Sequence, residues 1–407
     1  MENRKWFKTY MFIWAGQFAS MLTSYAVQFA IVIWLSLEYK SAEVLAYVGI
    51  AAMLPQALIG LIAGVYVDRL NRKYVMIFSD AFIAVCALVL LVILQNENVN
   101  LIWIYVLLGL RSIGNAFHTP ALQAIAPLIV PQSELIKVAG INQVLHSVCS
   151  IGGPAIGTLA IAYLPISMVL YLDLIGALLA ILSLVMVKIP DLVTKSKSSI
   201  HSITTDFLEG FQTISKNKGL RYLFLYAMAI TFIMMPAAIM FPLLTTGHYA
   251  GGKWEMGVIE VVWGGGMLIG GAILSTFKLK GSKVVAVNVM YVLLGLTFIL
   301  SGALPASWFV GFVLTTAIGG ISLSVFNGCF TAIVQTEVSP DKLGRVFSLY
   351  YSLAVLPSVI GLLFTGLIAE VIGVNISFII SGCLAILVGI LSFGTRNLMQ
   401  LDKIKNV

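Results

Sequence analysis

Long runs of apolar residues, separated by short polar stretches, make up most of this chain. A helix of about 20 apolar residues crosses a bilayer, whereas the strands of a membrane β-barrel are about ten residues long and alternate in polarity. The runs here are long, rich in glycine and poor in charge, so the pattern predicts an all-α membrane protein. Twelve transmembrane helices are expected, at residues 10–37, 43–66, 74–95, 100–126, 138–163, 166–187, 219–246, 255–277, 283–303, 306–333, 344–372 and 374–395.

The longest polar stretch divides these helices into two sets of six. The predicted parts are an N-terminal six-helix half at 1–187, a cytoplasmic linker at 188–218, a C-terminal six-helix half at 219–395 and a cytoplasmic tail at 396–407. Within the linker, Ile203, Phe207, Phe211 and Ile214 recur at helical spacing. This spacing predicts a short amphipathic helix at the inner membrane surface, with a partner-binding helix as the alternative.

A weak internal repeat supports the division into halves. Leu135 aligns with Leu343 and Gly153 with Gly361 at an offset of 208 residues, about half of the chain. Paired halves of this kind place a binding cavity between them, near the middle of the membrane.

The distribution of basic residues predicts the orientation. The net charge is +7 at pH 7, but the basic residues lie in short loops between apolar runs, so we expect a lipid bilayer and no nucleic acid as partner. Only Lys40, Lys253 and Arg111 fall outside the loops and termini expected on the cytoplasmic side. The four cysteines lie in apolar runs without metal-binding spacing, and no nucleotide-binding loop is present. We therefore expect no cofactor or metal, and no ATP-driven activity.

A charged turn, GVYVDRLNRK at residues 64–73, separates the second and third predicted helices. Its charged side chains cannot enter hydrocarbon at low cost, so the chain surfaces here. They are Asp68, Arg69, Arg72 and Lys73. Gly64 allows close helix approach and Asn71 tolerates a left-handed turn. The simplest alternative is a basic loop that only fixes topology.

A few ionisable residues lie inside the predicted helices. Arg111 must face protein or water and find a partner, either in function or in holding helices together. Asp173 has the best depth for binding a substrate or proton, and Asp80 is the second candidate. Asp80 is also expected to pair with the charged turn as part of a gate. His118 and His146 are expected to be hydrogen-bonded packing residues.

Two kinds of side chain are candidates for a substrate cavity. Neutral hydrogen-bonding groups are offered by Gln17, Gln28, Asn142 and Gln143, and aromatic surface by Tyr171, Trp263 and Phe326. Such a cavity suits a large amphipathic or cationic small molecule.

Several of these motifs resemble those of the major facilitator superfamily. GVYVDRLNRK is similar to the loop after the second helix, and LGLRSIGNA to a fourth-helix pattern whose arginine, here Arg111, is linked to proton coupling. Gly153, Pro154 and Gly157 match part of the fifth-helix pattern of antiporters, although Cys149 and Thr158 replace its outer glycines.

The opening FIWAGQ and the turn VDRLNRK look most like bacterial macrolide-efflux proteins of the drug:proton antiporter group. The resemblance implies a monomer in the bacterial inner membrane, not an enzyme, that exports a hydrophobic drug by alternating access as protons enter. In this scheme the charged turn and the fifth-helix motif form the gate. The alternatives are an exporter of a native metabolite, such as a siderophore or lipid, and a non-transporting sensor or scaffold.

Overall fold

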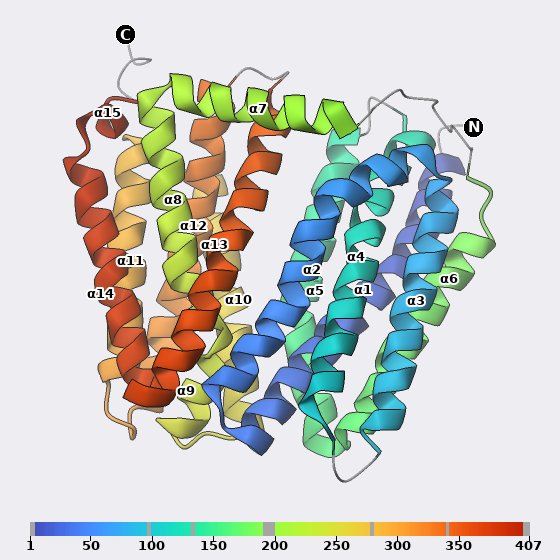
Figure 1. Cartoon of the computed structure of the whole chain (residues 1–407), viewed down its shortest axis with the longest axis horizontal. Helices are drawn as coiled ribbons and strands as arrows, with labels where there is room; N and C mark the ends of the chain where they lie inside the picture. Colours follow the sequence, from blue (N-terminus) through green and yellow to red (C-terminus); the bar gives the residue numbers. More distant parts are fainter. Residues whose placement is uncertain are drawn as a thin grey trace. The chain divides into compact units, whose positions relative to one another are not determined.

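The computed structural model describes residues 5–95, 99–131, 135–189, 200–276, 281–338 and 342–401, in which helices are joined by short turns (Figure 1). The helices are α1 (Lys5–Tyr39), α2 (Ala42–Arg69), α3 (Arg72–Ile93), α4 (Leu101–Ile129), α5 (Leu135–Tyr163), α6 (Ile166–Val185), α7 (Ile200–Lys216), α8 (Lys218–Ile239), α9 (Phe241–Gly247), α10 (Lys253–Thr276), α11 (Lys283–Ala303), α12 (Phe309–Glu337), α13 (Leu343–Ile372), α14 (Val374–Gly394) and α15 (Arg396–Met399).

The predicted all-α membrane fold is confirmed. Within the described residues, eleven helices are long and apolar enough to cross a membrane. α13 is a further helix of 30 residues, which accounts for the twelfth predicted span.

One predicted helix is broken in two. The apolar run 219–246 forms α8 and the separate short helix α9, with Met240 between them at φ −92° and ψ 2°. Pro242 follows in the first turn of α9. Because proline has no backbone N–H, it cannot continue the hydrogen-bond ladder of a preceding helix, and it is tolerated where a new helix begins.

The chain forms two compact units. One comprises α1 to α6, and the other comprises α7 to α15 together with the short segment Tyr39–Ala46 at the junction of α1 and α2. In the first unit, α3 packs against α4 and α6; in the second, α11 packs against α12 and α14.

Small residues allow the close helix packing in both units. A side chain at Gly157 of α5 would collide with the backbone of Ala26 in α1. In the second unit, a side chain at Gly320 of α12 would collide with the backbone carbonyl of Trp263 in α10. Glycine at these positions therefore sets the distance between the helices.

The core of the second unit is aromatic. The ring of Phe241 in α9 lies 5.1 Å from Phe378 and 5.9 Å from Phe312, and Phe312 stacks on Tyr249 at 4.5 Å. The Tyr249 hydroxyl donates a hydrogen bond of 2.6 Å to the carbonyl of Ser301. The break after α8 thus places Phe241 in the centre of this ring cluster.

The linker forms the amphipathic helix α7, which crosses the ends of α8 and α13 and contacts both (Figure 1). Ile214 is buried, whereas Leu208 and Phe211 are about half exposed. The predicted apolar positions Ile203 and Phe207 have side chains outside the described set, and the position of α7 at a membrane surface stays a prediction.

Candidate functional site

The buried face of α4 carries two ionisable residues, Arg111 and His118. They are seven residues apart, two helical turns, so they lie about 10 Å apart along the same face. Each contacts a buried carboxylate from a different neighbouring helix.

Arg111 forms an ion pair with Asp173 of α6. The guanidinium Nη1 lies 2.5 Å from the Asp173 Oδ2, and the side chains are only 7% and 2% exposed. The contact is a close ion pair rather than an aligned hydrogen bond, since neither atom meets hydrogen-bond geometry. Ser24 of α1 donates a hydrogen bond of 2.6 Å to the other carboxylate oxygen. The pair thus neutralises two charges that would be costly if buried alone.

Asp80, His118 and Gln17 form a second polar cluster, which joins α3, α4 and α1. The His118 Nε2 lies 3.3 Å from the Asp80 Oδ1 and 3.0 Å from the Gln17 Oε1. The Gln17 amide nitrogen donates to the Asp80 Oδ2 at 3.4 Å. Because Nε2 faces two oxygen acceptors, we assign a proton to that nitrogen. Asp80 therefore pairs with His118, and the expected pairing with the charged turn is corrected.

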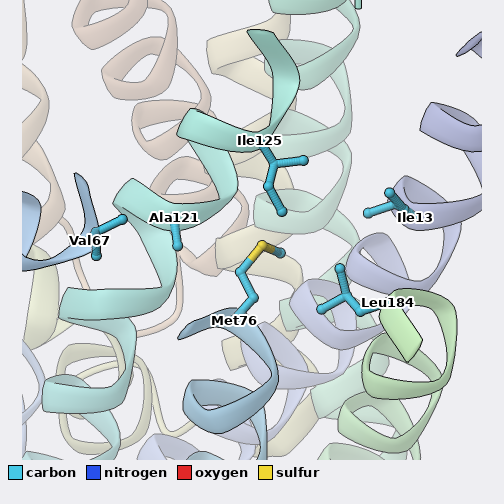
Figure 2. Close-up of a cluster of buried hydrophobic side chains, with 6 residues drawn as sticks. All are labelled: Ile13, Val67, Met76, Ala121, Ile125 and Leu184. Atoms are coloured by element: carbon cyan, nitrogen blue, oxygen red, sulfur yellow. The ribbon is translucent and has the colours of Figure 1, made fainter. Parts of the chain in front are cut away.

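An apolar layer lies one helical turn from this second cluster. Ile13 precedes Gln17 by four residues, Met76 precedes Asp80 by four, and Ala121 follows His118 by three. Figure 2 shows these side chains converging with the others of the same layer. The complete layer is Ile13, Val67, Met76, Ala121, Ile125 and Leu184. It separates the polar cluster from the end of the unit at which the charged turn lies.

The charged turn is fixed to neighbouring helices by its basic residues. Asn71 is the N-cap of α3 in an extended conformation, and its side chain accepts hydrogen bonds from the Lys73 and Tyr74 amides, so the expected left-handed turn is corrected. Arg72 donates to the carbonyl of Ala124 at 3.1 Å, and Lys73 donates to the carbonyl of Val187 at 2.7 Å. Cations are favourable beside such C-terminal carbonyls. The side chains at Gly64, Asp68 and Arg69 lie outside the described set.

The fifth-helix motif is a contact surface between α5 and α1. A side chain at Gly153 would collide with Tyr25, as one at Gly157 would with Ala26. Pro154 is inside α5, and its carbonyl accepts a hydrogen bond from Thr158 at 2.8 Å. The motif thus permits tight packing, and its part in a gate stays a prediction.

The predicted cavity residues fall in different environments. Gln17 is fully buried with its amide engaged in the second cluster, so it is not available to a substrate. Asn142 accepts a hydrogen bond from the hydroxyl of Tyr10. Gln28 is half-buried, and the side chain of Gln143 lies outside the described set.

The predicted aromatic residues do not gather at one site. Tyr171 is about half exposed and lies on an apolar stripe of α6 that includes Met168 and Ile175, a pattern typical of a lipid-facing surface. Phe326 is buried, with its ring 5.1 Å from that of Tyr291. Trp263 packs against Phe241 at 5.7 Å.

α4 also carries a polar stripe that was not predicted from the sequence. Asn115, Thr119 and Gln123 recur every four residues and are all exposed, whereas Arg111 and His118 on the same helix are buried. Polar side chains at membrane depth almost always face protein or a water-filled cavity. Their spacing alone was enough to find them, because residues four apart share one helix face.

Comparisons with known proteins agree on the family. The family described as transmembrane secretion effector, MFS_3, matches residues 6–406. The chain is similar to macrolide efflux protein A of Streptococcus pyogenes, with 35% identity over 98% of this chain and 99% of that protein. It is also similar to the multidrug efflux pump Tap of Mycobacterium bovis, with 22% identity over 91% of this chain and 89% of that protein.

Solved structures share the fold at low sequence identity. A bacterial homologue of the human lysosomal transporter Spinster, in an inward-facing and unoccupied conformation, matches with a TM-score of 0.76 and 13% identity, covering 97% of this chain and 98% of that one. The nucleoside transporter NupG matches with a TM-score of 0.72 and 14% identity, covering 95% and 98%. The chain is therefore a multi-pass membrane protein that belongs to the major facilitator superfamily of transporters, in its transmembrane secretion effector family.

Proposed function

We propose that this protein exports large hydrophobic or amphipathic drugs, macrolides among them, in exchange for protons. The observation that carries the proposal is the buried Arg111–Asp173 ion pair on facing transmembrane helices. The name of the Streptococcus pyogenes relative, a macrolide efflux protein, supports the direction of transport and the class of cargo.

Packing alone gives little reason to keep this ion pair. Apolar side chains of similar volume often replace a buried ion pair with no loss of stability, whereas intramembrane charges mark ion and substrate pathways. A proton or a cationic drug that reaches Asp173 competes with Arg111 for the carboxylate. This competition couples the movement of the proton to that of the drug only if the proton and the drug prefer different conformations of the protein.

The substrate surface that we propose is polar on one side and apolar on the other. Asn115, Thr119 and Gln123 supply exposed hydrogen-bonding groups on α4, and Gln28 and Asn142 remain candidates from the predicted set. A macrolide carries hydroxyl groups, an amino sugar and a wide apolar ring, which match such a surface. Because Tyr171 and Phe326 occupy a lipid-facing stripe and a buried core, we leave them out of this site.

The gate, orientation and assembly are further parts of the proposal. The charged turn and the Gly153–Gly157 contact act as the inner gate between conformations. The basic residues of the short loops support an orientation with both termini in the bacterial cytoplasm. The transporting unit is a monomer.

A resistance assay tests the function. A macrolide-sensitive strain that expresses this protein should tolerate at least fourfold more erythromycin than one with an empty vector, and a protonophore should abolish active efflux. The single variant Arg111→Gln should remove the resistance, while Tyr171→Phe, on the lipid-facing stripe, should keep it. Unchanged sensitivity, together with a metabolite that accumulates in the medium, would instead identify an exporter of a native compound.

A further inference from the structure

We propose that the Gln17–Asp80–His118 cluster is the site that takes up and releases the transported proton, with His118 as the group that changes charge. The inference rests on the proposed antiport and assigns its proton to a residue outside the Arg111–Asp173 pair. His118 then has a transport role in addition to packing.

The two ionic contacts on α4 differ in whether they can titrate. A guanidinium stays protonated at any pH that a cell meets, so Arg111 holds a permanent positive charge beside Asp173. Imidazole changes charge between about pH 5 and 8. Of the two cations on α4, only the side chain of His118 can therefore gain and lose a proton.

The groups around His118 can accommodate both the neutral and the protonated ring. In the assigned tautomer, the Nε2–H of His118 points toward the Asp80 Oδ1 at 3.3 Å and the Gln17 Oε1 at 3.0 Å. An incoming proton adds to Nδ1 and produces an imidazolium whose counter-ion, the Asp80 carboxylate, is in contact. Release from Nδ1 restores the neutral ring, so the step requires no bond other than the N–H to form or break.

Among the described residues, the only ionisable side chain in contact with His118 is Asp80. The buried faces of the surrounding helices carry Tyr10 on α1, Cys86 on α3, Arg111 on α4, Cys149 on α5 and Asp173 on α6. Among the described contacts, none of these five residues hydrogen-bonds to His118 or forms an ion pair with it, and the described buried residues of α2 include no ionisable group. Asp80 is therefore the counter-ion closest to a proton that binds His118.

The apolar layer limits access to the cluster from one side. Met76 is fully buried one turn from Asp80, and Ala121 is fully buried one turn from His118. A proton cannot cross such a layer without water, so exchange with the end that bears the charged turn requires the layer to open. Alternating access requires that the site of the coupled ion be open to only one side of the membrane at a time.

The test uses the full-length protein in liposomes with radiolabelled erythromycin. Two rates are measured: accumulation driven by an imposed pH gradient, and exchange of labelled for unlabelled drug at equal pH. The variant His118→Gln keeps an amide donor for Asp80 but cannot titrate. It should lose gradient-driven accumulation at least tenfold and keep exchange within about twofold. The control is His248→Gln, a histidine of the second unit that contacts the carbonyl of Leu304, and it should keep both rates.

The outcomes separate this inference from the proposed function. If the wild type moves no erythromycin in either assay, the proposed function fails and the inference falls with it. If the wild type is active and His118→Gln keeps gradient-driven accumulation, or loses exchange and accumulation together, only the inference is overturned. Should the variant fail to fold, the gradient-driven accumulation by the wild type must still change with the pH of the medium at a constant pH gradient, and a flat profile refutes the assignment.

Discussion

The first and second units have interiors of different chemistry on matching helices. α4 and α12 have the same length, and both of their ends differ by the repeat offset of 208. At the position of Arg111, α12 has Gly319, and the ring of Trp263 lies against it. At the position of Asp173, α14 has Ser381, and at that of His118, α12 has Phe326. The same helical frame thus holds ions in one unit and rings and hydroxyls in the other.

This contrast indicates a division of work between the units. Among the described residues, the buried ionisable side chains of Asp80, Arg111, His118 and Asp173 all lie in the first unit. The buried polar side chains described in the second unit are hydroxyls and the amide of Asn288, which accepts a hydrogen bond of 2.6 Å from Ser392. The serine and threonine hydroxyls and the amide do not change charge near neutral pH, and Glu260 of α10 is only partly buried, so we expect most proton-dependent steps to reside in the first unit.

The largest effect is expected from breaking the Arg111–Asp173 pair. Arg111→Gln leaves the Asp173 carboxylate buried without its counter-ion, which costs about 3–5 kcal/mol. The thermal midpoint in detergent should fall sharply, and efflux should cease. The double variant Arg111→Gln with Asp173→Asn removes both charges, so it should recover most of the stability but no transport. If Arg111→Gln were as stable as the wild type, the carboxylate of Asp173 would not depend on Arg111 as its counter-ion.

Glycine substitutions should affect both units alike, and so test whether the contrast is confined to charge. Gly157→Ala and Gly320→Ala each direct a methyl group at a backbone carbonyl of the facing helix. Overpacking of this kind costs about 1–3 kcal/mol. Melting curves of the two variants should shift by similar amounts. A large shift in one unit only would indicate that the units also differ in packing.

Two N-caps offer a matched comparison of smaller size. Asn71 caps α3 and Ser282 caps α11, the corresponding helix of the second unit. Replacement of either by alanine should cost about 0.5–2 kcal/mol. Efflux should decrease only for Asn71→Ala, because that cap orders the charged turn of the proposed gate. Equal loss of efflux in both variants would remove the turn from the gate.

The smallest effect is expected at Tyr249, outside the membrane spans of the second unit. Burial raises the pKa of Tyr249 to about 12. The unfolded tyrosine loses its proton near pH 10, so between these values the folded state becomes less stable as the pH rises. Tyr249→Phe should cost about 1 kcal/mol at neutral pH, through loss of the hydrogen bond to Ser301, and should flatten the alkaline decline. Unfolding curves at pH 8 and pH 11 measure the loss at neutral pH and the alkaline decline. An identical decline in the wild type and in Tyr249→Phe would contradict the raised pKa of Tyr249.

The helices were predictable because a bilayer requires long apolar runs, but the break after α8 was not. The run 219–246 stays apolar through Pro242, so hydropathy alone gives no boundary there. A proline after an apolar run either kinks a helix or starts a new one, and the choice depends on what the next residue packs against. Here Phe241 enters an aromatic core formed by residues far along the chain.

The candidate site was predictable as a set of residues but not as a set of contacts. Arg111, Asp173 and Asp80 stand out because charge is rare in the membrane segments. Their partners depend on how helices distant in sequence rotate toward one another, and a single sequence does not contain that information. For this reason Asp80 was assigned to the nearby charged turn, and Gln17 to a cavity, whereas the two residues contact each other.

The apolar layer in Figure 2 has a consequence for the cell as well as for the fold. If Met76 or Leu184 were replaced by a serine, water could wet the layer and form a wire from the bath to the buried carboxylates. A protein with such a leak would discharge the proton-motive force whether or not a drug was present. The toxicity of such variants, in cells never exposed to an antibiotic, would report how well these six side chains insulate the membrane.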